Sequence, residues 1–78
     1  MQPIAVDCLF REDGTILVRR IMQDGQWHAV EQGRQWQDGA GRHVLVMLDG
    51  RQVHELVLNS ESLIWEFRSR QRSGATVV

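Results

Sequence analysis

The side chains of this chain that could bind a metal ion are few and widely spaced. His28, His43, His54 and Cys8 are its usual soft or borderline ligands. None has a partner at a metal-binding spacing such as Cys-x-x-Cys or His-Glu-x-x-His, so a site would need three segments to converge. We therefore predict no metal and no cofactor, histidines that are exposed or hydrogen-bonded, and a Cys8 that belongs to the core.

Acid–base catalysis would need a proton donor and a proton acceptor that face the same point. The candidates are His54, Glu55, Glu31 and Asp7. Adjacent residues of a strand point to opposite faces, so His54 and Glu55 could not act together. The chain also lacks a glycine-rich phosphate loop and a nucleophile elbow. The sequence thus predicts a protein without enzymatic activity, and a metal-dependent or oligomeric enzyme is the third alternative.

Tryptophan and arginine are the side chains with the strongest binding potential. The three tryptophans, Trp27, Trp36 and Trp65, are expected to serve the core first, and Trp36 is the best candidate for exposure because polar residues flank it. Aromatic and arginine side chains dominate the binding energy of protein interfaces. The predicted binding residues are Arg34, Trp36, Arg42 and Arg51, with a second contact in the tail from Arg68, Arg70 and Arg72.

The same residues could bind nucleic acid, because arginine pairs with phosphates and aromatic rings stack on bases. The formal net charge of the chain is −1, however, and acidic residues are interspersed among its nine arginines. Domains that bind nucleic acids usually carry a basic balance. A protein partner is therefore the first prediction, within a DNA-maintenance assembly, and weak nucleic-acid binding is the second.

The length of 78 residues predicts one domain, over residues 1–68, followed by a flexible basic tail over residues 69–78. The start of the sequence lacks the pattern of a signal peptide, and no apolar run is long enough to span a membrane. A single cysteine cannot form an internal disulfide. We expect a cytoplasmic protein.

Four Asp-Gly pairs divide the chain into stretches in which apolar and polar residues alternate. Asp-Gly is typical of the type I′ turns that join antiparallel strands. The pairs begin at Asp13, Asp24, Asp38 and Asp49, and a bulge or bend is expected at Gly33. The predicted strands cover residues 4–10, 15–22, 27–32, 43–48, 51–58 and 63–68, with a loop at 38–41.

Six short strands joined by tight turns predict an all-β fold. The best fit is an antiparallel meander curled into an SH3-like barrel, and an OB-like barrel or an open sheet is the alternative. The sequence leaves open whether the protein is a monomer or a homodimer that pairs through strand edges.

The spacing of several core residues resembles an uncharacterised family of small bacterial β-barrel domains. The resemblance covers roughly residues 10–68 and is carried by Trp27, Trp36, Gly50, the pair Glu55-Leu56 and Trp65. It implies a compact β-barrel. Some members are encoded beside genes for error-prone DNA synthesis, which implies a link to DNA maintenance.

Overall fold

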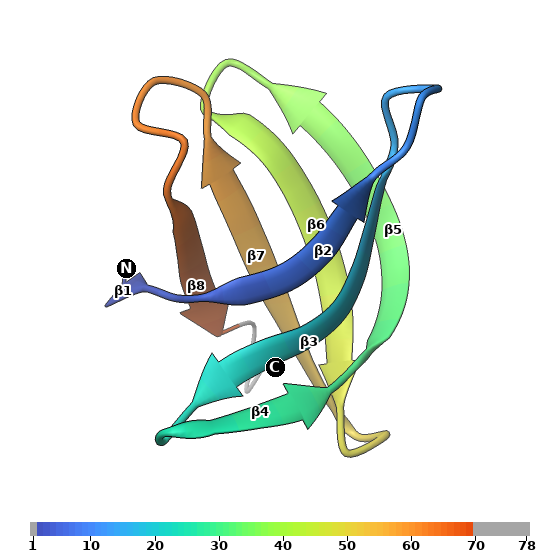
Figure 1. Ribbon diagram of the computed structural model, residues 1–78, viewed down its shortest axis with the longest axis vertical. Coiled ribbons are helices and arrows are strands. Elements are labelled where there is room, and N and C mark those ends of the chain that lie inside the picture. The colour runs from blue at the N-terminus through green and yellow to red at the C-terminus, as the bar shows by residue number, and fades with distance from the viewer. Residues whose placement is uncertain (1, 70–78) are drawn as a thin grey trace, which may run out of the picture.

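The computed structural model describes residues 2–69, which fold into eight antiparallel strands without a helix (Figure 1). The predicted all-β antiparallel class is confirmed. The strands are β1 (Gln2–Pro3), β2 (Val6–Phe10), β3 (Ile16–Gln23), β4 (Gln26–Ala29), β5 (Glu31–Asp38), β6 (Gly41–Leu48), β7 (Gln52–Asn59) and β8 (Trp65–Ser69). In this part of the chain, no helix has the length and hydropathy that crossing a membrane requires.

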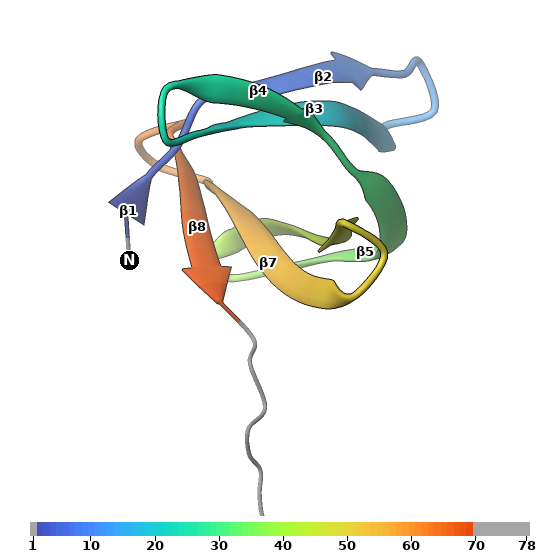
Figure 2. The same cartoon turned by 90° about the horizontal axis from the view of Figure 1, so that it is seen from below.

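The strands form two sheets that pack face to face (Figure 2). One has three strands in the order β2-β3-β4, and the other has five in the order β1-β8-β7-β6-β5. The chain passes directly from one sheet to the other at Val30, between β4 and β5. Neighbouring strands are consecutive in the sequence, as expected for a meander, except that the short β1 pairs with β8.

Two of the four Asp-Gly pairs adopt the predicted type I′ geometry. Asp24 and Gly25, which join β3 to β4, have φ values of 54° and 75°, and Asp49 and Gly50, which join β6 to β7, have φ values of 58° and 67°. The second turn sets the register of β6 and β7, in which Leu48 lies opposite Gln52. The hairpin is therefore as predicted, but its register is not: a two-residue turn would pair Leu48 with Arg51, and the observed pairing is shifted by one residue.

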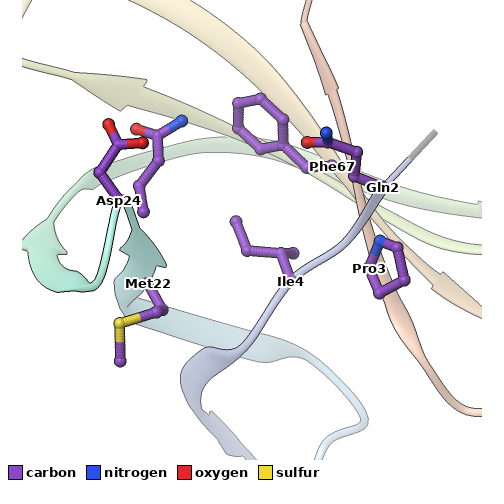
Figure 3. A pocket seen from close by; sticks show the side chains of 7 residues that line it. Gln2, Pro3, Ile4, Met22, Asp24 and Phe67 are labelled. Atoms are coloured by element: carbon purple, nitrogen blue, oxygen red, sulfur yellow. The ribbon is translucent and has the colours of Figure 1, made fainter.

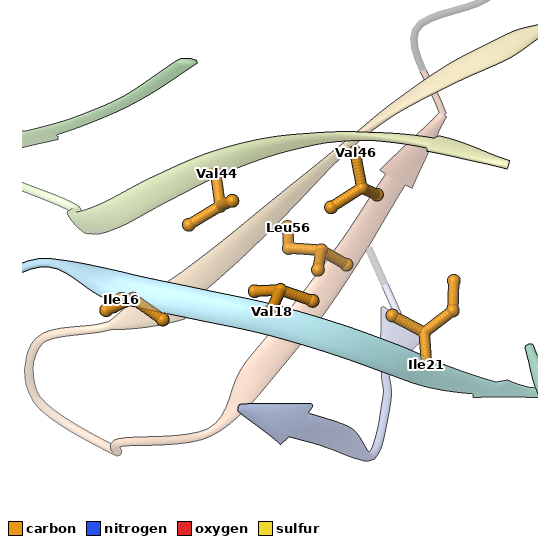
Figure 4. Packing of buried hydrophobic residues seen from close by; sticks show 6 residues of the cluster. All are labelled: Ile16, Val18, Ile21, Val44, Val46 and Leu56. Atoms are coloured by element: carbon orange, nitrogen blue, oxygen red, sulfur yellow. The ribbon is translucent and has the colours of Figure 1, made fainter. Parts of the chain in front are cut away.

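The core lies between the two sheets (Figure 4). Its fully buried side chains come from β3, β6 and β7 and are Ile16, Val18, Ile21, Val44, Val46 and Leu56. Strict alternation along β3 predicts that Ile21 lies on the other face of the strand from Ile16 and Val18, and that prediction was wrong. The β2–β3 register shifts between Asp7 and Cys8, which leaves Arg19 as an extra residue and returns Ile21 to the core face.

Strand β5 is the element that the sequence analysis missed. It continues past Gly33 to Asp38, where we expected a bend and then a loop, and it pairs with β6 from Glu31 to Asp38. The register does shift between Gln32 and Gln35, so the expected irregularity exists, but it does not end the strand.

Glutamine side chains join the two sheets where β3 faces β5. Gln32 accepts a hydrogen bond from Val18 N at 2.7 Å and donates one to Ile16 O at 2.8 Å. Gln35 accepts from Ile16 N at 3.0 Å and donates to Ile16 O at 2.9 Å. Side-chain amides thus satisfy main-chain groups that backbone pairing would satisfy in a closed barrel.

Candidate functional site

A buried histidine lies between two carboxylates on the outer face of the five-stranded sheet. His43 is next to Val44 in β6, and since Val44 faces the core, the imidazole points to the opposite side. Its Nδ1 donates to Oε2 of Glu55 at 2.5 Å, and its Nε2 donates to Oδ1 of Asp38 at 2.8 Å. Ionised carboxylates only accept hydrogen bonds, so this arrangement fits the doubly protonated ring.

Trp36 lies over this histidine. The two residues are opposite each other on β5 and β6, and their rings stack with centroids 4.9 Å apart and an interplanar angle of 4°. The guanidinium of Arg34, two residues earlier on the same strand, lies 5.1 Å from the centroid of the Trp36 ring. Arg34, Trp36 and His43 therefore form one stacked group, which we call the Trp36 site together with Asp38 and Glu55.

The electrostatics of the site favour a charged histidine. Burial of the ring opposes protonation, but the hydrogen bonds to Glu55 and Asp38 and the charges of both carboxylates outweigh it, and the pKa of His43 is raised. The hydrogen bond from His43, helped by one from the Ala40 amide, lowers the pKa of Asp38. The two shifts have a common cause, because each partner stabilises the charged form of the other.

The site is well shielded although it lies on an outer face. His43 is 5% exposed and Glu55 is 4% exposed, while the three-stranded sheet packs on the other side of these strands (Figure 2). Arg68 of β8 approaches Glu55 at 3.8 Å and is itself about half exposed. The network therefore ties β5, β6, β7 and β8 together through side chains.

The structure brings some of the predicted binding residues together and separates others. Arg34 and Trp36 are in contact, and Arg68 joins the same network through Glu55. Arg42 donates instead to the carbonyl of Gly14, in the turn between β2 and β3. Arg51 follows the turn at the far end of β6. Arg70 and Arg72 lie outside the described residues, as does the predicted tail beyond Ser69.

The sequence analysis missed the polar half of this site. Glu55 was considered only with its neighbour His54, and the structure does place these two on opposite faces, with His54 toward Phe67. The true partner of Glu55 is His43, from the facing strand. The Asp49-Gly50 turn alone could not have found it, because a two-residue turn would pair Leu48 with Arg51 and place His43 and Glu55 on opposite faces. The observed pairing of Leu48 with Gln52 places them on the same face, two residues apart along the ladder.

The other two tryptophans have different surroundings. Trp65 packs against the core as expected, close to Cys8, and burial together with the neighbouring Asp7 raises the pKa of the Cys8 thiol. Trp27 on β4 is 42% exposed, whereas Trp36 is partly buried, so the prediction that Trp36 is the exposed tryptophan was wrong. Its ring lies 5.1 Å from the guanidinium of Arg20, which is paired with Asp7 at 2.9 Å.

One hollow among the described residues is smaller than a typical ligand pocket. A shallow hollow of about 190 Å³ lies between the start of the chain and the β3–β4 turn (Figure 3). Ligand pockets commonly occupy roughly 300–1,000 Å³. Within residues 2–69, no three His, Cys, Asp or Glu side chains are grouped so that they could hold a metal ion.

Comparison of the chain with family models, curated proteins and solved structures gave no match. The resemblance to small bacterial β-domains therefore stays a prediction.

Proposed function

We propose that this protein is a non-enzymatic binding module that docks to a protein partner through the Trp36 site. The observation that carries the proposal is the stack of Arg34 on Trp36, because it presents a fixed aromatic and guanidinium surface on a rigid sheet. Trp and Arg are the residues most enriched among interface hot spots. A side chain that is already ordered in the free protein loses less entropy on binding.

The charge of Arg34 points to the chemistry of the partner. Among residues 2–69 no acidic group pairs with Arg34, whereas the comparable Arg20 beside Trp27 already has Asp7. A partner carboxylate could bind the Arg34 guanidinium in a bidentate manner. An apolar group of the partner would then pack against the part of Trp36 that Arg34 and His43 leave accessible, rather than on a ring face. We therefore expect an acidic group next to an apolar one on the partner.

Two other functions fit the site less well. A nucleobase would have to displace Arg34 or His43 in order to stack on Trp36, and Asp38 and Glu55 would repel phosphate. A general base needs a ring nitrogen that can accept a proton from a substrate, but a carboxylate occupies each nitrogen of His43. The resemblance described above is the reason to place the partner in a bacterial DNA-maintenance assembly.

The test is affinity capture from the source cell with matched tryptophan variants. The bait is the intact chain, a Trp36→Ala, Arg34→Ala variant, or a Trp27→Ala variant, which also removes an arginine-capped tryptophan but on the other sheet. Each captured protein is then purified and titrated against the three baits at low and high salt. We expect the Trp36 variant to weaken binding at least about tenfold and the Trp27 variant to have little effect.

The same experiment separates the alternatives. Equal loss with both variants would mean that the Trp36 site is not the contact. Nucleic acid that binds only at low salt would favour the second function, because phosphate contacts weaken steeply as salt is added.

A further inference from the structure

Strand β2 is an edge strand with one open side. It pairs with β3 and forms the end of the order β2-β3-β4, and no other described strand pairs with it. Figure 1 shows it crossing the front of the molecule with β3 on one side. Leu9 and Phe10 on this strand are 50% and 57% exposed. Edge strands are often protected by Pro or Lys, and β2 contains neither.

The hydrogen bonds at both ends of β2 show which of its main-chain groups face the open side. Arg11 N donates to Thr15 O at 2.9 Å, so the main-chain N–H and C=O groups of Arg11 and Leu9 point toward β3. Those of Phe10, which lies between them, point away from β3. Ala5 O accepts from Met22 N at 3.0 Å, which gives the same phase at the other end of the strand. The residues whose main-chain N–H and C=O groups point to the open side are therefore Val6, Cys8 and Phe10.

We propose that β2 pairs in an antiparallel manner with β2 of a second copy of this chain, about a two-fold axis at Cys8. The outward residues are spaced evenly around Cys8, so this register places Val6 opposite Phe10 of the second copy and Cys8 opposite its own equivalent. Each such pair exchanges two hydrogen bonds, about six in all. A two-fold interface needs a surface that is complementary to itself, and this edge has that property.

The side chains of β2 suit the same register. Phe10 would cover Val6 of the second copy, which removes an exposed ring from water. The one charged residue of the strand is Asp7, whose charge is already balanced by Arg20 at 2.9 Å. The result is a continuous six-stranded sheet, a common size in globular proteins. The Trp36 site is on the other sheet, so this interface does not depend on the proposed function.

The test combines sedimentation equilibrium with residue-resolved amide exchange. We expect the dimer to appear as concentration rises, and we expect the amides of Val6, Cys8 and Phe10 to become protected with it. Asp7 and Leu9 already bond to β3, so the protection of their amides should depend much less on concentration. This period-two pattern is specific to pairing at the outer edge of β2.

Proline variants test the edge directly. Phe10→Pro and Val6→Pro each remove an amide that faces away from β3, so the β2–β3 ladder keeps its bonds. Each should weaken dimerisation at least about tenfold, and Phe10→Ala, which keeps the amide, should retain the exchange pattern. Having two proline positions allows for one variant that fails to fold.

Three results would overturn the proposal. One is a wild-type chain that stays monomeric at millimolar concentration. Another is a dimer whose concentration-dependent protection lies outside Val6, Cys8 and Phe10. An edge that binds a strand of a different protein would give the first result, because the isolated chain would stay monomeric. The third is dimerisation by a folded proline variant with wild-type affinity.

Discussion

The Nδ1 atom of His43 lies 2.5 Å from Oε2 of Glu55, and both side chains are almost completely buried on the outer face of a sheet. Breaking such a pair on one side leaves a buried charge without its partner. We therefore expect Glu55→Gln to lower the free energy of unfolding by about 1.5–3 kcal/mol. Asp7→Asn, which removes a more exposed carboxylate from its pair with Arg20, should cost at most about 1 kcal/mol. Urea unfolding of both variants measures the difference, and equal costs would contradict it.

The same pair should make stability depend on pH. The pKa of His43 is raised in the folded state, so its stabilising contribution is fully present below its unfolded pKa of about 6.5 and is lost as pH rises through the folded value. The pKa of Asp38 is lowered, so its contribution is lost as pH falls below about 4. The effect of Glu55→Gln should be larger at pH 5.5 than at pH 9. A pH-independent effect would show that His43 is not charged in the fold.

His54 should act in the opposite direction. It is buried against Phe67 with its ring centroid 4.8 Å away, and its Nδ1 has no hydrogen-bond partner among the described residues. Burial lowers the pKa of His54, so acid protonates the unfolded chain first and stability falls below pH 6.5. His54→Leu should remove this sensitivity and gain more stability at pH 5 than at pH 8. Thermal unfolding at both values tests it, and an unchanged acid response would exclude His54 as its cause.

Gly41 should tolerate no side chain. Its φ is 148°, and a Cβ there would lie 2.0 Å from the carbonyl oxygen of Leu58. We expect Gly41→Ala to cost more than about 3 kcal/mol, because β6 and β7 must separate to admit the methyl group. Gly39→Ala is the control, since nothing lies within 4 Å of its Cβ position. Similar unfolding midpoints in urea for the two variants would show that the close approach is not maintained.

Gln32 and Gln35 between the sheets should contribute more to the free energy of unfolding than polar residues on the surface do. Gln32→Ala leaves the Val18 amide of β3 without its partner and Gln35→Ala does the same to the Ile16 amide, each at a cost of about 1–3 kcal/mol. Both glutamines donate to Ile16 O, so the double variant should depart from additivity. Unfolding of the single and double variants completes the cycle. Additive costs would mean that the two bonds to Ile16 are independent.

The sequence was most informative where local chemistry decides the structure. The Asp-Gly turns at Asp24 and Asp49 require positive φ, and they correctly predicted two hairpins. Alternation failed at Arg19, because a bulge shifts the phase of a strand without changing its composition. It failed again for β5, whose inward-facing residues are Gln32 and Gln35, since a polar residue that bonds to a distant main chain has the same local pattern as a surface residue.

The candidate site was predicted in part for similar reasons. Arg34 and Trp36 are two residues apart on one strand, so their contact follows from local geometry. Arg42 is on the strand beside them but faces the other way, and only the register of β5 and β6 shows this. The bridge from His43 to Asp38 and Glu55 needs three strands in register, which no local pattern contains.

The glutamine contacts between β3 and β5 also indicate how the molecule moves. Four side-chain hydrogen bonds hold this boundary, whereas continuous backbone ladders hold the interior of each sheet. Partial opening of a protein begins where the fewest bonds must break together. The two sheets should therefore separate here before either sheet loses hydrogen bonds in its middle. Opening would break the bonds of Gln32 and Gln35, and Val30 would act as the hinge.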